Sequence, residues 1–153
     1  MLVASTRRAR ARFFAPRYTE ERDHGPSPPP RGCTNVTRLY MFDVDDTLEV
    51  SGGPVSLDQL AELRLTGHIL GLCGNWSVVT RTVKDWHRLF SLIGPVSATK
   101  EEFLRQIAEN VPADEYVMVG NILGVSGASD DQGSAQSAGW RFIQESDFAL
   151  GVR

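Results

Sequence analysis

The fold is decided by the stretch Leu39-Tyr40-Met41-Phe42-Asp43-Val44-Asp45-Asp46-Thr47. Its first four residues form an apolar run with the length and character of a buried parallel strand. Three carboxylates follow at the carboxyl end of that strand, where open α/β sheets place their ligand sites. Because crowded carboxylates repel one another unless a cation or a proton neutralises them, the stretch indicates either a divalent-metal site or a protonated acid.

Two other interpretations of these acidic residues compete with a chemical site. An acidic segment after a strand is often only a turn or a helix cap. A calcium loop of the EF-hand type requires Gly at its sixth position and Glu at its twelfth. Counting from Asp43, those positions hold Leu48 and Pro54, so the spacing excludes such a loop.

Length and composition limit the classes of protein to consider. A chain of 153 residues supports one domain with a proper core. Its net charge of −3 is unevenly distributed. Residues 1–38 carry a net charge of +5, and the rest of the chain carries a net charge of −8. An acidic domain is a poor nucleic-acid binder. Cys33 and Cys73 form no disulfide framework or zinc pattern, and no apolar stretch could span a bilayer, so we expect a cytoplasmic protein.

Residues 1–37 have the composition of an unfolded segment. They contain the arginine-rich run 7–12 and the proline-rich run 25–30, with little apolar periodicity. We expect a disordered tail, or a segment upstream of the true start of the protein. A targeting peptide, which would place the protein in an organelle, and a basic tail that contacts anions are the alternatives.

From residue 39 onward, strand-like and helix-like segments alternate. Further strands are expected at residues 69–73, 91–96, 116–120 and 140–143. Helices are expected at residues 56–64, 78–90, 99–111 and 130–138. The helices that begin at Ser56 and Thr99 each open with a capping box, Ser56–Gln59 and Thr99–Glu102. This order predicts an α/β fold with a parallel sheet and helices on both faces.

Three segments together point to a family. They are Asp43–Leu48, Lys100 at the opening of a helix, and Asp130-Asp131 leading to Gly139. In their order and spacing, residues 39–147 resemble the haloacid dehalogenase superfamily of aspartate-nucleophile phosphatases. The resemblance implies a Rossmann-like domain over residues 38–153. Asp45 favours phosphate chemistry, since the dehalogenating members are expected to lack an acid two residues after the nucleophile.

The resemblance also implies roles for these residues. Asp43 would attack phosphorus and form an aspartyl-phosphate, and Asp45 would protonate the leaving oxygen and later accept a proton from water. Lys100 would offset negative charge on the nucleophile and the phosphate. Mg²⁺ would be held by Asp43, by the main-chain carbonyl of Asp45 and by an acid of the fourth motif. Taken alone, Lys100 could equally be a solvated lysine at a helix start.

The chain departs from the family pattern at two positions. The second motif ends its strand with Ser or Thr, and the matching position here is expected to be Cys73, a much weaker donor. We therefore expect the substrate to be bound by Thr47, Cys73, Gly74 and Asn75.

The fourth motif usually begins with Gly-Asp, but this chain has Gly120-Asn121. Because Asn is a neutral, weaker ligand for a hard cation, Asp130 or Asp131 would have to supply the missing charge at the metal. The alternative for Asp130-Asp131 is a plain helix cap.

Spacing leaves no room for a cap domain. Only a loop and a helix separate Asp43 from Cys73, and only a helix and a strand separate Cys73 from Lys100. An uncapped site favours a bulky or macromolecular phosphorylated substrate, or a cap lent by a partner subunit. We therefore expect a Mg²⁺-dependent phosphatase. The alternative is a non-catalytic relative that binds a phosphorylated ligand or a protein, and a nucleic-acid-processing enzyme has support only from residues 7–12.

Overall fold

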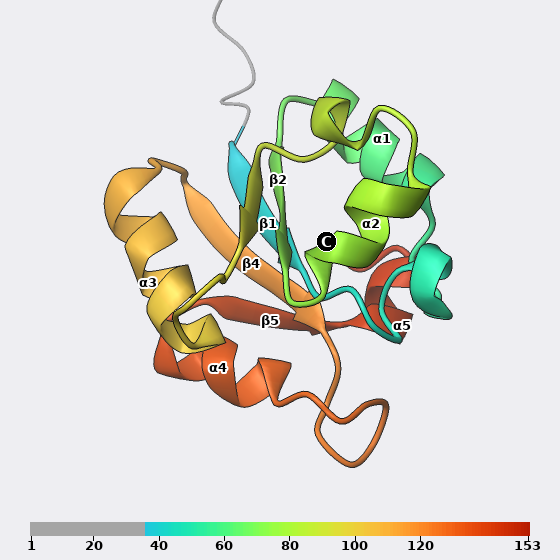
Figure 1. Ribbon diagram of the computed structural model, residues 1–153. Coiled ribbons are helices and arrows are strands. Elements are labelled where there is room, and N and C mark those ends of the chain that lie inside the picture. Colours follow the sequence, from blue (N-terminus) through green and yellow to red (C-terminus); the bar gives the residue numbers. More distant parts are fainter. Residues whose placement is uncertain (1–35) are drawn as a thin grey trace, which may run out of the picture. The chain divides into compact units, whose positions relative to one another are not determined.

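The computed structural model describes residues 36–153, so the predicted disordered segment lies outside the described residues except for its last two. The described chain forms a five-stranded sheet in the order β3-β2-β1-β4-β5 (Figure 1). The strands are β1 (Arg38–Phe42), β2 (Ile69–Cys73), β3 (Leu92–Gly94), β4 (Glu115–Gly120) and β5 (Arg141–Gln144). Every neighbouring pair is parallel, which confirms the predicted α/β fold.

Helices cover both faces of this sheet, as predicted. They are α1 (Leu57–Leu65), α2 (Trp76–Thr82), α3 (Lys100–Asn110), α4 (Asp131–Ser137) and α5 (Glu145–Ala149). In Figure 1, α1, α2 and α5 lie on one face and α3 and α4 lie on the other. The two hydrophobic clusters follow this division, because one contains Leu60 and Phe148 while the other contains Leu104 and Ala135.

Strand β1 lies at the centre of the molecule. Its register pairs Tyr40 with Leu70 of β2 on one side and with Val117 of β4 on the other. Side chains alternate along the strand, so Tyr40 and Phe42 join one cluster and Leu39 and Met41 join the other. All four are completely buried, as the continuous apolar run predicts for a strand covered on both faces.

The helix starts follow the predicted capping boxes. Ser56 and Thr99 each accept a hydrogen bond from the main-chain N–H three residues later, and the side chains of Gln59 and Glu102 accept from the main-chain N–H groups of Ser56 and Thr99. Each box satisfies two donors at a helix start. The second box fixes Lys100 as the first residue of α3.

The predicted helix over residues 78–90 is present only as far as Thr82. Helix α2 ends at Thr82, Asp85 has a φ of +57°, and a 3₁₀ turn follows over Trp86–Arg88. The Thr82 hydroxyl donates to the Val78 carbonyl, and such back-bonding weakens a helix. The apolar periodicity still predicted burial, since Trp86 packs against the core. The short helix α5, directly after β5, was not predicted.

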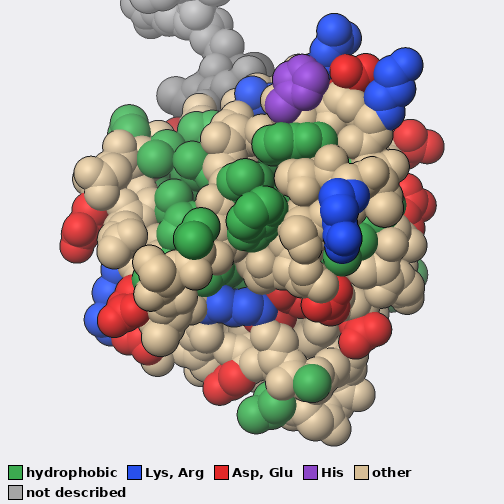
Figure 2. All heavy atoms as spheres, in the orientation of Figure 1, with side chains coloured by type: hydrophobic (Ala, Val, Ile, Leu, Met, Phe, Trp, Pro, Cys, Tyr) green, Lys and Arg blue, Asp and Glu red, His purple; other side chains and the backbone are tan. Residues whose placement is uncertain are grey.

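No inserted domain separates the strands that approach the carboxyl edge. Between β1 and β3 the chain contains only α1, α2, β2 and two 3₁₀ turns. Strand β3 forms one edge of the sheet, with Ile93 and Val96 exposed, and Figure 2 shows hydrophobic side chains gathered over this part of the surface. None of the helices within residues 36–153 is long and apolar enough to cross a membrane.

Candidate active site

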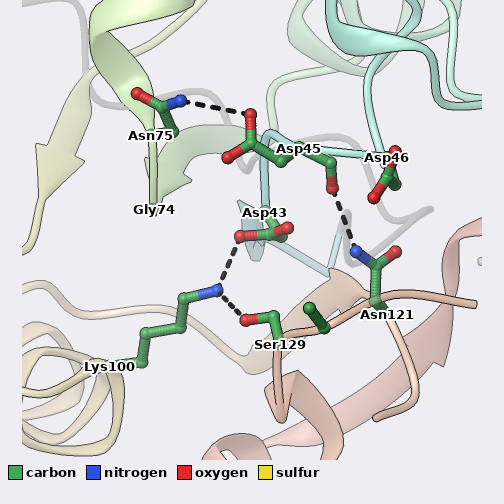
Figure 3. Close-up of a pocket in the computed structure, with 9 residues that line it drawn as sticks. Asp43, Asp45, Asp46, Gly74, Asn75, Lys100, Asn121 and Ser129 are labelled. Carbon is green, nitrogen blue, oxygen red and sulfur yellow. Dashed lines mark hydrogen bonds and ion pairs between the residues drawn. The ribbon is translucent and has the colours of Figure 1, made fainter. Parts of the chain in front are cut away.

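A cavity of about 330 Å³ lies at the carboxyl end of the sheet. Its walls come from the ends of β1, β2 and β4, from the start of α3, and from the loop before α4 (Figure 3). The lining residues are Asp43, Asp45, Asp46, Gly74, Asn75, Lys100, Asn121, Ala128 and Ser129. The sheet topology thus brings together segments that are far apart in the sequence.

Asp43 is the buried carboxylate of the cavity, with 3% of its surface exposed. Its main-chain N–H donates to the Val119 carbonyl at 2.9 Å, which continues the β1–β4 ladder and fixes the residue at the strand end. Burial raises the pKa of Asp43 from 3.8 to about 6, although the nearby Lys100 ammonium opposes the rise. The Asp43 carboxyl therefore titrates close to neutrality while it contacts a cation.

Lys100 connects three segments of the chain. Its Nζ donates to Asp43 Oδ1 at 2.6 Å, to Ser129 Oγ at 2.6 Å and to Asp131 Oδ1. Burial alone lowers the pKa of Lys100, but the Asp43 and Asp131 carboxylates outweigh burial and raise that pKa above 10.5. The ammonium is therefore charged and bound, which rules out a lysine that is merely solvated at a helix start.

The acidic pair 130–131 divides into two different roles. Asp131 is completely buried, and its Oδ2 accepts from the Asn121 main-chain N–H at 2.9 Å while its Oδ1 accepts from Lys100 and from the Ser129 hydroxyl. Asp130 is exposed and caps α4 by accepting from the Gly133 N–H at 2.9 Å. Asp131 thus supports the cavity wall, whereas Asp130 acts as a plain helix cap.

Asp45 has its main chain and its side chain held from opposite sides. Its carbonyl oxygen accepts from Asn121 Nδ2 at 3.0 Å, and its carboxylate Oδ1 accepts from Asn75 Nδ2 at 3.2 Å (Figure 3). Thr47 is completely buried and does not line the cavity; its hydroxyl donates to Asn121 Oδ1 at 3.2 Å. Thr47 therefore contacts Asn121 and not the cavity.

The structure places Gly74, and not Cys73, beside Asp43. Cys73 is completely buried in the cluster that faces α3 and α4, and burial raises the pKa of its thiol to about 12. A Cβ on Gly74 would lie 2.5 Å from Asp43 Oδ1, and Gly74 has a φ of +135°. The position that faces Asp43 thus has no hydroxyl and little space for one.

Sequence reasoning missed two serines of the site. Ser129 lines the cavity and contacts Lys100, and Ser77 donates to Asn75 Oδ1 at 3.0 Å. Each lies within two residues of a predicted site residue, and this proximity is the one signal that could have suggested them. Asp46 also lines the cavity and adopts a φ of +56°, a left-handed conformation that Asp tolerates better than most residues.

The oxygen atoms around Asp45 that could act as metal ligands fit a hard cation only in part. Within residues 36–153, no three His, Cys, Asp or Glu side chains are grouped in a way that could hold a metal ion. Oxygen donors do converge, however: the Asp43 carboxylate, the Asp45 carbonyl and the Asn121 amide, of the type that Mg²⁺ prefers. The Asn121 amide would have to turn its oxygen toward Asp45, and the Thr47 hydroxyl can partner either end of the amide.

Comparison of the chain with protein-family models, with curated proteins and with solved structures found no match.

Proposed function

We propose that the protein is a Mg²⁺-dependent phosphomonoester hydrolase of the haloacid dehalogenase type, without a cap domain. The observation that carries the proposal is the buried Asp43 carboxylate bound to Lys100, with Asp45 two residues later lining the same cavity. Phosphoryl transfer requires mainly positioning and neutralisation of charge, and this arrangement supplies both. The parallel sheet supports the same assignment, because it brings the three segments that carry the resemblance to one edge.

In the first step, an oxygen of the Asp43 carboxylate attacks phosphorus and the bond from phosphorus to the leaving oxygen breaks. Asp45, in its acid form, gives its proton to that oxygen, so the alcohol departs neutral and an aspartyl-phosphate remains. Asp43 has a raised pKa of about 6, and the Lys100 ammonium stabilises its ionised, nucleophilic form at neutral pH.

In the second step, Asp45 accepts a proton from a water molecule whose oxygen attacks phosphorus. The bond between Asp43 and phosphorus breaks, inorganic phosphate leaves, and both carboxyl groups return to their starting states. Over the two steps one phosphomonoester and one water give one alcohol and one phosphate. Splitting the hydrolysis in this way replaces one difficult step by two easier ones.

Lys100 and its partners keep the charges of the cavity in place. Three carboxylates and one ammonium line the cavity, so it is net negative when all are ionised. Asp131 and Ser129 hold the Lys100 ammonium against Asp43. When bound by Asp43, the Asp45 carbonyl and the Asn121 amide oxygen, Mg²⁺ would supply the remaining positive charge for the phosphoryl oxygens.

A screen for phosphate release tests the proposal. The full chain should hydrolyse at least one of a set of nucleotides, sugar phosphates and phosphopeptides, with activity lost in EDTA and restored by Mg²⁺. Asp43→Asn should lower turnover by several powers of ten, because uncatalysed ester hydrolysis is extremely slow. Beryllium fluoride should bind wild type and not Asp43→Asn. Equal phosphate release by wild type and Asp43→Asn would contradict the assignment.

Two observations favour a second candidate, a non-catalytic module that binds a phosphorylated ligand or a protein. Gly74 presents no hydroxyl to a phosphoryl group, and the Asn121 amide is already satisfied by Thr47 and Asp45. A wild-type protein that binds no Mg²⁺ at millimolar concentration, and that releases phosphate from no ester, would favour this candidate over the enzyme.

A further inference from the structure

We propose that Asn75 is a positioning residue that holds the Asp45 carboxylate for its proton transfers, and that Ser77 supports the Asn75 side chain through its amide oxygen. The assignment rests on the proposed hydrolase activity. It gives Asn75 a role other than direct contact with the substrate.

The hydrogen bonds among these residues have one consistent direction. Ser77 Oγ donates to Asn75 Oδ1 at 3.0 Å, and Asn75 Nδ2 donates to Asp45 Oδ1 at 3.2 Å. The amide nitrogen of Asn75 faces the Asp45 carboxylate (Figure 3). A carboxylate can accept from this nitrogen but not from the oxygen. The Asp45 carboxylate therefore sets the orientation of the amide, and the Ser77 hydroxyl, which donates to the amide oxygen, holds the Asn75 side chain in that place.

Asn75 occupies a position at which its side chain would ordinarily do something else. It is the N-cap residue of α2, and Asn is among the preferred N-cap residues because its side chain accepts from main-chain N–H groups. Here the Asn75 side chain makes no capping hydrogen bond. It binds the side chains of Asp45 and Ser77 instead, so its contacts serve the cavity and not the helix start.

The Asp45 carboxylate needs such a restraint. Asp45 is exposed, and within the described part of the chain no other side chain donates to its carboxylate. Asn121 fixes only the Asp45 main chain, which leaves the side chain free to rotate. By occupying Oδ1, Asn75 leaves Oδ2 to exchange a proton with the leaving oxygen and with water. Proton transfer requires such placement within hydrogen-bond reach.

This role predicts a dependence on the leaving group. The 4-nitrophenolate ion departs without a proton, whereas an alkoxide requires one. Loss of Asn75 should therefore impair hydrolysis of an alkyl phosphate more than hydrolysis of 4-nitrophenyl phosphate. The ratio kcat/KM isolates the first step, in which Asp45 acts as the acid.

The test compares kcat/KM for glycerol 2-phosphate and 4-nitrophenyl phosphate in the full chain with Mg²⁺. Asn75→Ala should lower the value for glycerol 2-phosphate by about 100-fold, the lower end of general-acid contributions, and the value for 4-nitrophenyl phosphate by less than about fivefold. Ser77→Ala should lower both values, but by less than Asn75→Ala does. Ser77→Thr, which keeps a hydroxyl at this position, should leave both values near those of the wild type. Thr82→Ala, which removes an exposed hydroxyl from the same helix, is the matched control and should change neither.

Thermal unfolding of the same variants separates positioning from a structural role. Because Asn75 makes no capping bond, Asn75→Ala should shift Tm by no more than a few degrees. Equal losses on the two esters, or a Thr82→Ala variant with the same selectivity as Asn75→Ala, would overturn the assignment while leaving the proposed hydrolase intact. A wild type that hydrolyses neither ester and forms no phosphoenzyme would overturn both.

Discussion

Replacing Asp43 by Asn should stabilise the metal-free protein near neutral pH while it removes the proposed nucleophile. Burial raises the pKa of Asp43 from 3.8 to about 6, so the folded state favours the protonated carboxyl. The stability that this protonated form contributes is fully present below about pH 4 and is lost as the pH rises through about 6. At pH 8 the ionised Asp43 therefore costs up to about 3 kcal/mol of unfolding free energy, which a neutral Asn would avoid.

Denaturant unfolding in EDTA at pH 8 and pH 4 measures this effect. Asn at position 43 keeps an oxygen that can accept from Lys100, so we expect Asp43→Asn to gain about 1–3 kcal/mol at pH 8 and almost nothing at pH 4. Asp58→Asn, an exposed change on α1 that removes the same charge, is the control and should show no such gain at pH 8. A loss of stability at pH 8, or an equal gain at both pH values, would refute the reasoning.

Three further substitutions test other parts of the site. The Asn121→Asp variant should bind Mg²⁺ more tightly than wild type, as measured by titration calorimetry, because the number of charged ligands sets affinity at hard-cation sites. Its Tm should also depend more strongly on Mg²⁺. A variant that binds no more tightly than wild type would contradict the assignment of Asn121 to the metal. Lys100→Ala should lower the unfolding free energy at pH 8 by about 3 kcal/mol, since it leaves Asp43 and Asp131 without their cation. The loss should be smaller in an Asp43→Asn background, and additive effects of the two substitutions would argue against this pairing. Cys73→Ala should cost about 1 kcal/mol of core stability but change kcat/KM by less than about threefold, because the thiol does not line the cavity; a larger kinetic effect would place Cys73 in the site.

Burial and the alternation of strands and helices along the chain could be predicted because they depend on short-range patterns. The continuous apolar run over residues 39–42 predicted a strand covered on both faces, and the capping box at Thr99 predicted the start of α3. A capping box signals its own helix start, so Lys100 could be placed at the first turn of a helix. The acidic residues after the first strand likewise line the predicted edge of the sheet.

The direction of side chains at the cavity could not be predicted from the sequence. Cys73 and Gly74 are adjacent, and a shift of one residue decides which of them faces Asp43. Which of Asp130 and Asp131 turns inward depends on the first turn of α4, where a cap and a buried carboxylate are equally compatible with the sequence. These choices are settled by contacts with segments far away in the chain.

The central position of β1 has a consequence for how the chain is made. Its partner β4 lies 77 residues later, as the pairing of Arg38 with Glu115 indicates, and contacts of such long range form slowly. While the chain is being synthesised and β4 is not yet present, β1 forms an open edge of the sheet. An open edge of this kind is a template for aggregation. We therefore expect the Asp43 environment to be completed only when residues 115–131 join the sheet, and fragments that end before Glu115 to require a chaperone to remain in solution.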